Sequence, residues 1–182
     1  LRGVVVLEEA LDLLEAGVRL DEVALGKAVI TRPWFRTMGR FAVLSGNPLA
    51  GSDAAAMAGK RIGVIGDTVH ARWLARHYSA SETVAFDDEA KAYEALRTGN
   101  VDAYFGDNLR IIYWVAGSVS ERCCRLLGGA YSDFDTFSRN LSFVVRGDRD
   151  DLRAALDYGL DAAQTDGTTE RIFNAYVPLS PW

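Results

Sequence analysis

The sequence lacks the features that mark membrane-spanning and nucleic-acid-binding proteins. No run of apolar residues reaches the roughly 18 that a helix needs to cross a bilayer. The 182 residues carry a net charge of −5, which is modest and of the wrong sign for nucleic acid. No leader peptide is visible, and this absence is not evidence for the cytoplasm. We therefore expect a chain that is not embedded in a membrane and does not bind nucleic acid.

The sequence also lacks the common motifs of catalysis and of nucleotide binding. GxSxG, HExxH, GxxxxGK[ST] and GxGxxG are all missing, and no spacing of serine and histidine indicates a triad. The only cysteines, Cys123 and Cys124, are adjacent, and adjacent cysteines rarely pair because the ring is strained. They have neither CxxC spacing nor a histidine nearby in sequence, so we expect two buried thiols and no metal site. Nothing here demands an enzyme or a cofactor.

Strands alternate with helices along most of the chain. The expected strands are Arg40–Leu44, Lys60–Ile65, Thr83–Phe86, Val101–Phe105, Cys123–Leu127 and Leu141–Val145. The expected helices are Leu7–Glu15, Thr68–Tyr78, Asp88–Arg97, Asn108–Ala116, Asp151–Thr165 and one that starts near Thr168. This alternation predicts an α/β fold with a parallel sheet covered by helices on both faces.

The turn "GVIGDT" is the first candidate binding site. Ligands of open parallel sheets bind beyond the carboxyl ends of the strands, where loops lead into helices. Gly66 permits close approach of the backbone, and the N–H groups around Thr68 and Val69 favour an anion such as a carboxylate. A plain helix cap is the alternative, and the charge of Asp67 weakens the anion interpretation.

Asp107 is the second candidate, because a mostly apolar strand ends on this carboxylate just where a helix begins. It lies at the same expected sheet edge and could accept a charge-assisted hydrogen bond from a ligand ammonium. The alternative is again capping of the following helix. Asp102, at the start of the same strand, is expected to be structural.

Other candidates are an arginine-rich segment and two histidines. "TRPWFRTMGR" combines Arg32 and Arg36 with Trp34, and an arginine there suits a ligand carboxylate better than nucleic acid. His70 is expected to be an exposed residue of the first helical turn rather than part of a cleft. His77 lies near the end of the same helix, where a cationic side chain complements the dipole.

Four segments, in order, resemble the type II periplasmic solute-binding proteins, in particular the amino-acid-binding group (extracellular solute-binding family 3). They are "PWFRTMGRFAVLSG", "MAGKRIGVIGDTVHARWL", "VAFDDEAKAYEALRTGNVDAYFGDNLRIIYWV" and "LSFVVRGDRDDLRAALDYGLDAAQTDGTTERIFNAYV". The resemblance implies two α/β lobes, joined by two crossing hinge strands, that close over a small solute. It places lobe 1 at residues 1–47 and 136–182 and lobe 2 at residues 48–135. The first βα unit of the family is not recognisable, so lobe 1 is expected to be shortened or diverged.

The resemblance also implies roles for the candidate residues. Thr68 and its neighbouring N–H groups would hold a solute carboxylate, and Asp107 would hold its α-ammonium. Arg32 or Arg36 would stand in for the family's carboxylate-binding arginine. The implied solute is an amino acid or a small carboxylate, the implied partner is the membrane permease of an ABC importer, and the implied location is the periplasm.

Three further interpretations of the same fold remain open. The chain could be a sensor module of a receptor or a binding protein associated with a periplasmic oxidoreductase. It could be a dehydratase-like enzyme, for which Glu170, His70 and Asp67 are the candidate acids. It could also be the effector-binding domain of a transcription regulator, which requires a helix-turn-helix that this sequence does not contain.

Overall fold

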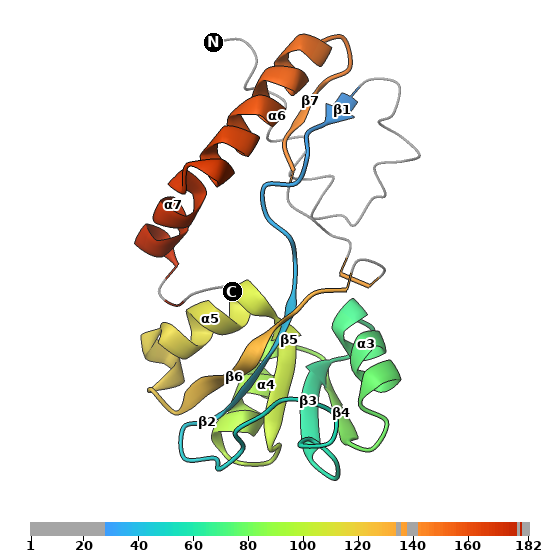
Figure 1. Ribbon diagram of the computed structural model, residues 1–182. Helices are drawn as coiled ribbons and strands as arrows, with labels where there is room; N and C mark the ends of the chain where they lie inside the picture. The colour runs from blue at the N-terminus through green and yellow to red at the C-terminus, as the bar shows by residue number, and fades with distance from the viewer. Residues whose placement is uncertain (1–27, 134–135, 138–141, 178, 180–182) are drawn as a thin grey trace. The chain divides into compact units, whose positions relative to one another are not determined.

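The computed structural model describes residues 28–133, 136–137, 142–177 and 179 (Figure 1). These residues form two compact units. One holds the described residues up to Arg36 together with 142–171, and the other holds those from Thr37 to 137 and from Ile172 onward. The helix expected at Leu7–Glu15 lies outside the described residues. These units are defined by which residues pack together. The residue ranges expected for the two lobes of a binding protein therefore stay a prediction.

The second unit is built on a mixed sheet of five strands. In spatial order they are β4 (Glu82–Phe86), β3 (Arg61–Ile65), β5 (Ala103–Asp107), β2 (Gly39–Leu44) and β6 (Cys124–Tyr131). β3 is parallel to β4 and to β5, whereas β2 is antiparallel to β5 and to β6. The expected parallel arrangement is therefore right for the strands joined by helical crossovers and wrong at β2, which precedes the first of those helices.

Helices cover both faces of this sheet, as the sequence predicts. They are α3 (Val69–His77), α4 (Glu89–Arg97) and α5 (Asn108–Ala116), and a 3₁₀ turn, η1 (Ser118–Ser120), follows. Successive side chains of a strand point to opposite faces. Phe41 and Phe105 accordingly pack with Trp73 of α3, whereas Tyr104 packs with Leu96 of α4 on the other face.

Polar residues set the first turn of each of these helices. Thr68, Asp88 and Asp107 are the N-caps of α3, α4 and α5. Each side chain accepts a hydrogen bond from the N–H three residues further on, at 3.2, 2.8 and 3.0 Å respectively. Such a cap contributes about 1 kcal/mol relative to alanine, which explains why the helices begin where the sequence predicts.

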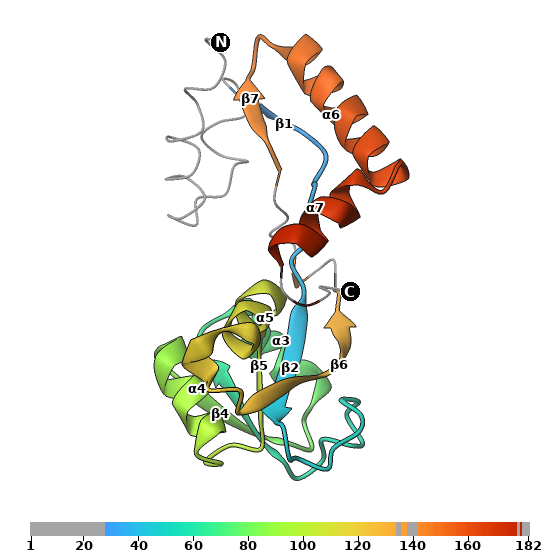
Figure 2. The ribbon, with the colours of Figure 1, turned by 90° about the vertical axis from the view of Figure 1, so that its left-hand side faces the viewer.

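The first unit pairs two short strands with a long helix. β1 (Ala28–Ile30) is antiparallel to β7 (Val144–Arg146), and α6 (Asp150–Thr165) packs against both, as Figure 2 shows. α7 (Thr168–Tyr176) begins shortly after α6 ends. The buried carboxylate of Asp157 in α6 accepts hydrogen bonds from the Arg32 N–H and from the Arg153 guanidinium, both at 2.7 Å. It thereby anchors the chain that leaves β1.

The prediction of two free thiols is wrong in this structure. Cys123 and Cys124 form a disulfide between adjacent residues, immediately before and at the start of β6. Glu121 and Arg122, which precede it, both have left-handed backbones, with φ of 53° and 56°. Nothing in the local sequence indicates this turn, which brings the two sulfur atoms into bonding position.

The disulfide leads to a test by thiol chemistry. Alkylation without reductant is expected to label neither cysteine, and a dithiol reductant should expose both, as intact mass would show. Because the bond joins neighbours and closes a very short loop, Cys123→Ser should change the free energy of unfolding by only about 1 kcal/mol. Two free thiols in protein kept away from reductant would contradict the bond.

Candidate functional site

The two predicted binding turns lie at the same edge of the five-stranded sheet. β3 and β5 are parallel neighbours, with Ile62 opposite Ala103 and Gly63 opposite Tyr104. The turn after β3 therefore lies beside the end of β5, where Asp107 starts the next helix. The structure thus brings Thr68 and Asp107 to one edge, as the sheet rule predicts.

Thr68 uses its hydroxyl within its own turn. The oxygen accepts from the Ala71 N–H at 3.2 Å and donates to the Ile65 carbonyl at 2.7 Å. The hydroxyl is therefore engaged as a cap, and the capacity of this turn to bind an anion rests on the main-chain N–H groups of Val69 and His70. These two groups open the first turn of α3, where the helix dipole favours negative charge.

Asp67 is an exposed residue in the left-handed region, with φ of 57°. Aspartate tolerates this conformation better than most residues. Its carbonyl accepts from the Arg72 guanidinium at 3.3 Å. This hydrogen bond holds the positive charge of Arg72 beside the start of α3, in the same turn as the Asp67 carboxylate. The Asp67 carboxylate is the charge that weakens the anion interpretation.

Asp107 caps α5 and keeps further hydrogen-bonding capacity. Its Oδ1 accepts from the Arg110 N–H at 3.0 Å, and the residue is half-buried. An ionised carboxylate has about four acceptor positions. Capping and binding of a ligand ammonium are therefore compatible roles for this side chain.

His70 is not the exposed residue that the sequence argument expects. Its ring stacks on Phe137 at 5.2 Å between centroids and meets Phe105 edge-on at 5.9 Å. Its Nε2 is shielded from solvent and has no hydrogen-bond partner among the described residues. His70, Trp73 and Leu74 occupy one helical face, and this spacing was the sequence signal that could have revealed the burial.

The surroundings of His70 favour its neutral form. Burial lowers the pKa of His70, and the nearby Arg110 charge acts in the same direction more weakly. The Asp107 carboxylate and a hydrogen bond to the Met38 backbone oppose this shift but do not outweigh it. The Met38 carbonyl also accepts from the Asn108 N–H at 3.0 Å, so it connects β2 to the start of α5.

The lowered pKa of His70 predicts a loss of stability in mild acid. The unfolded chain takes up the proton near the usual histidine pKa of about 6.5, whereas the folded chain resists it. The free energy of unfolding should therefore fall as the pH decreases below that value. His70→Asn should flatten this dependence, as denaturant titrations at pH 7 and pH 5 would show. If the free energy of unfolding falls by the same amount between pH 7 and pH 5 in both proteins, His70 is not the group responsible.

The candidate residues of the arginine-rich segment, Arg32, Trp34 and Arg36, belong to the first unit. Arg32 is exposed and pairs with Asp161 at 2.5 Å, and Trp34 is half-buried with its ring stacked 6.2 Å from Phe143. Arg36 is exposed. The roles of Arg32 and Arg36 in binding a solute carboxylate stay predictions, as do the ligand-binding roles of Trp34, Thr68, Asp67, Val69 and Asp107.

Two observations bear on the catalytic and metal-binding interpretations of the sequence. Glu170 is an exposed residue in the first turn of α7. Within the described residues, histidine, cysteine and carboxylate side chains form no cluster suited to a metal ion. None of the helices in that part of the chain has the length and hydropathy of a membrane span.

The architecture is that of the type II periplasmic binding-protein domains. Substrate-binding domain 2 of GlnP from Lactococcus lactis, solved in an open conformation, matches with a TM-score of 0.72 and 17% identity, over 95% of this chain and 75% of that one. No protein-family model matches the chain. The fold expected from the sequence resemblance is thereby confirmed.

Sequence similarity points to amino-acid-binding proteins. ABC transporter arginine-binding protein 1 of Escherichia coli K12 is 28% identical over 125 residues, which cover 66% of this chain and 48% of that protein. The histidine-binding periplasmic protein of Salmonella typhimurium is 25% identical over 124 residues, covering 67% and 48%. The chain therefore spans about half the length of the curated relatives it matches, and the resemblance stated from the four segments is confirmed.

Proposed function

We propose that the chain acts as a solute-binding component of an ABC-type importer and captures a small amino-acid-like or carboxylate solute. The observation that carries this proposal is the meeting of the Thr68 turn and Asp107 at one sheet edge. The turn offers main-chain N–H groups at a helix N-terminus, and Asp107 offers a carboxylate. This pair is complementary to the two charges of a zwitterion.

The similar proteins support an amino acid as the solute. Two of them are described as arginine-binding and histidine-binding proteins, and we extend that class of solute to this chain. The permease of an ABC transporter as partner and the periplasm as location belong to the same proposal. The similar proteins are described as binding proteins, and we propose no reaction for this one.

A thermal-shift and calorimetry panel tests the proposal. L-amino acids should raise the melting temperature, because a ligand at 100 times its Kd stabilises the folded chain by about 2.7 kcal/mol. Agmatine lacks the carboxylate and N-acetylarginine lacks the free ammonium, so both should bind far more weakly than arginine if arginine binds. If no compound on a broad panel of amino acids and small carboxylates shifts the melting temperature, the proposal fails for this chain.

A further inference from the structure

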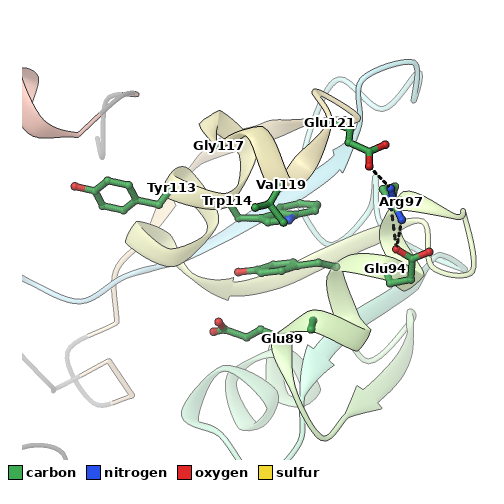
Figure 3. A pocket seen from close by; sticks show the side chains of 10 residues that line it. Glu89, Glu94, Arg97, Tyr113, Trp114, Gly117, Val119 and Glu121 are labelled. Atoms are coloured by element: carbon green, nitrogen blue, oxygen red, sulfur yellow. Dashed lines mark hydrogen bonds and ion pairs between the residues drawn. The ribbon is translucent and has the colours of Figure 1, made fainter.

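A groove of about 700 Å³ lies between α4 and α5 in the second unit, and its lining does not include the residues proposed to hold the solute. We call it the aromatic groove, and its defining residues are Tyr93, Arg97, Trp114, Val119 and Glu121. Figure 3 shows side chains of α4 on one side of it and those of α5 and the following turn on the other. None of these residues belongs to the turn at Thr68 or to the cap at Asp107.

Stacked aromatic rings give the groove a firm apolar lining. The Tyr93 and Trp114 rings are nearly parallel, with an interplanar angle of 6° and centroids 4.1 Å apart. Tyr104, which is buried in the core, meets Tyr93 edge-on at 5.1 Å. Burial also raises the pKa of Tyr93, so its hydroxyl stays protonated at ordinary pH. The aromatic part of the lining is therefore uncharged and packs on the core through Tyr104.

Apolar side chains at the groove remain open to water. Val119 is 80% exposed and Tyr113 is 49% exposed, although a valine or tyrosine on a folded domain gains free energy when it is covered. Both line the groove. Exposed apolar residues gathered at a concave site are typical of a surface that another molecule covers.

The charges around the groove favour a cation. The lining includes three carboxylates, from Glu89, Glu94 and Glu121, and one guanidinium, from Arg97. The Arg110 guanidinium, which is not part of the lining, pairs with Glu89 at 3.1 Å, so the five groups leave one net negative charge. Arg97 is shared by Glu94 at 2.7 Å and Glu121 at 2.9 Å, the two interactions drawn in Figure 3. The Glu94 and Glu121 side chains are 53% and 70% exposed, so an incoming cation can reach them. An aromatic face adds a cation–π attraction.

We propose that the aromatic groove docks an exposed segment of a partner protein in which an arginine or lysine lies beside an apolar side chain. The cationic head would pair with Glu121 and Glu94 near the Trp114 ring. The apolar neighbour would cover Val119 and Tyr113. A free inorganic cation would leave the apolar part of the groove in water, whereas a basic and apolar segment satisfies both parts. This proposal does not depend on the proposed solute binding.

Nuclear magnetic resonance of the ¹⁵N-labelled chain with two blocked peptides tests the docking. Acetyl-Leu-Arg-Leu-amide is the probe, and acetyl-Leu-Glu-Leu-amide is the matched control. Both lack a free α-ammonium and a free α-carboxylate, so neither imitates the solute proposed for Thr68 and Asp107. The arginine peptide should give saturable shifts of the amides in residues 89–97 and 113–121, and the glutamate peptide should not.

Variants sharpen the test. Glu121→Gln and Val119→Ser change exposed side chains. Each should lower the affinity for the arginine peptide about fivefold, as expected for the loss of one exposed charge pair or one apolar contact. Glu82→Gln, an exposed change on β4, should leave the affinity unchanged. Three outcomes would overturn the proposal: no saturable shift, equal shifts with the glutamate peptide, or shifts centred on Thr68 and Asp107.

Discussion

Asp107→Asn is expected to lower the affinity for an α-amino acid by about 100-fold while the fold stays intact. Asparagine caps a helix as well as aspartate does, so the hydrogen bond from the Arg110 N–H is kept. The negative charge that would pair with the ammonium is lost. A hydrogen bond to a charged group contributes about 1.5–3 kcal/mol, and each 1.4 kcal/mol is a factor of ten in affinity. Calorimetry with the tightest amino acid from the panel measures the change.

Asp88→Asn is the matched control for this prediction. Asp88 caps α4 in the same way, with its carboxylate 2.8 Å from the Lys91 N–H, but no binding role is predicted for it. This variant should bind like the wild type. Asp107→Ala should lose the cap as well and so destabilise the fold by about 1 kcal/mol. If Asp107→Asn binds amino acids with unchanged affinity, Asp107 is a cap and nothing more.

Phe105→Ala is expected to lower the free energy of unfolding by about 3–5 kcal/mol, the range for truncating a buried aromatic residue. Phe105 is fully buried, and its ring lies 4.5 Å from Phe41 and 5.0 Å from Trp73. It also forms one wall around His70. The substitution would leave a cavity beneath the sheet edge that carries Asp107. Denaturant unfolding of the whole chain, followed by circular dichroism, measures the loss.

Two comparisons make the Phe105 prediction specific. Phe105→Leu keeps most of the volume and should cost less than about 1.5 kcal/mol. Val119→Ala changes an exposed side chain and should cost less than about 0.5 kcal/mol. Gly39 faces the same ring, and a Cβ there would lie only 2.3 Å from the Phe105 Cζ. A cost below about 1 kcal/mol for Phe105→Ala would mean that this packing is not formed.

Local signals in the sequence predicted the βα core of the second unit closely. From β3 to α5, the expected elements end within one or two residues of the observed bounds. Period-two apolar strands, polar caps and Gly99, with its φ of 75°, are all local in sequence. The antiparallel course of β2 was not predictable in this way, because it depends on partners in β5 that lie 62–68 residues further along the chain.

The features of the candidate site likewise separate into those that depend on local sequence and those that depend on distant residues. A rule about strand ends predicted the common edge of Thr68 and Asp107, because it needs only the order of the elements. The burial of His70 depends on Phe105 and Phe137, which come from distant segments, although its helical spacing hinted at it. The aromatic groove likewise joins residues of α4 and α5 that no motif connects. The roles of Arg32, Arg36 and Trp34 rest on the composition of their segment and, for the two arginines, on the resemblance.

The antiparallel course of β2 has a mechanical consequence. Its first residue, Gly39, pairs with Asp107 in β5 and with Tyr131 in β6. Two of the segments that lead from this unit to the other, before β2 and after β6, therefore start from the edge that carries Asp107. A solute held at this edge would lie where both connecting segments start. A pull on the segment before β2 would reach the Met38 carbonyl and the Asn108 N–H, and thus the residue next to Asp107, before it reached the rest of the sheet.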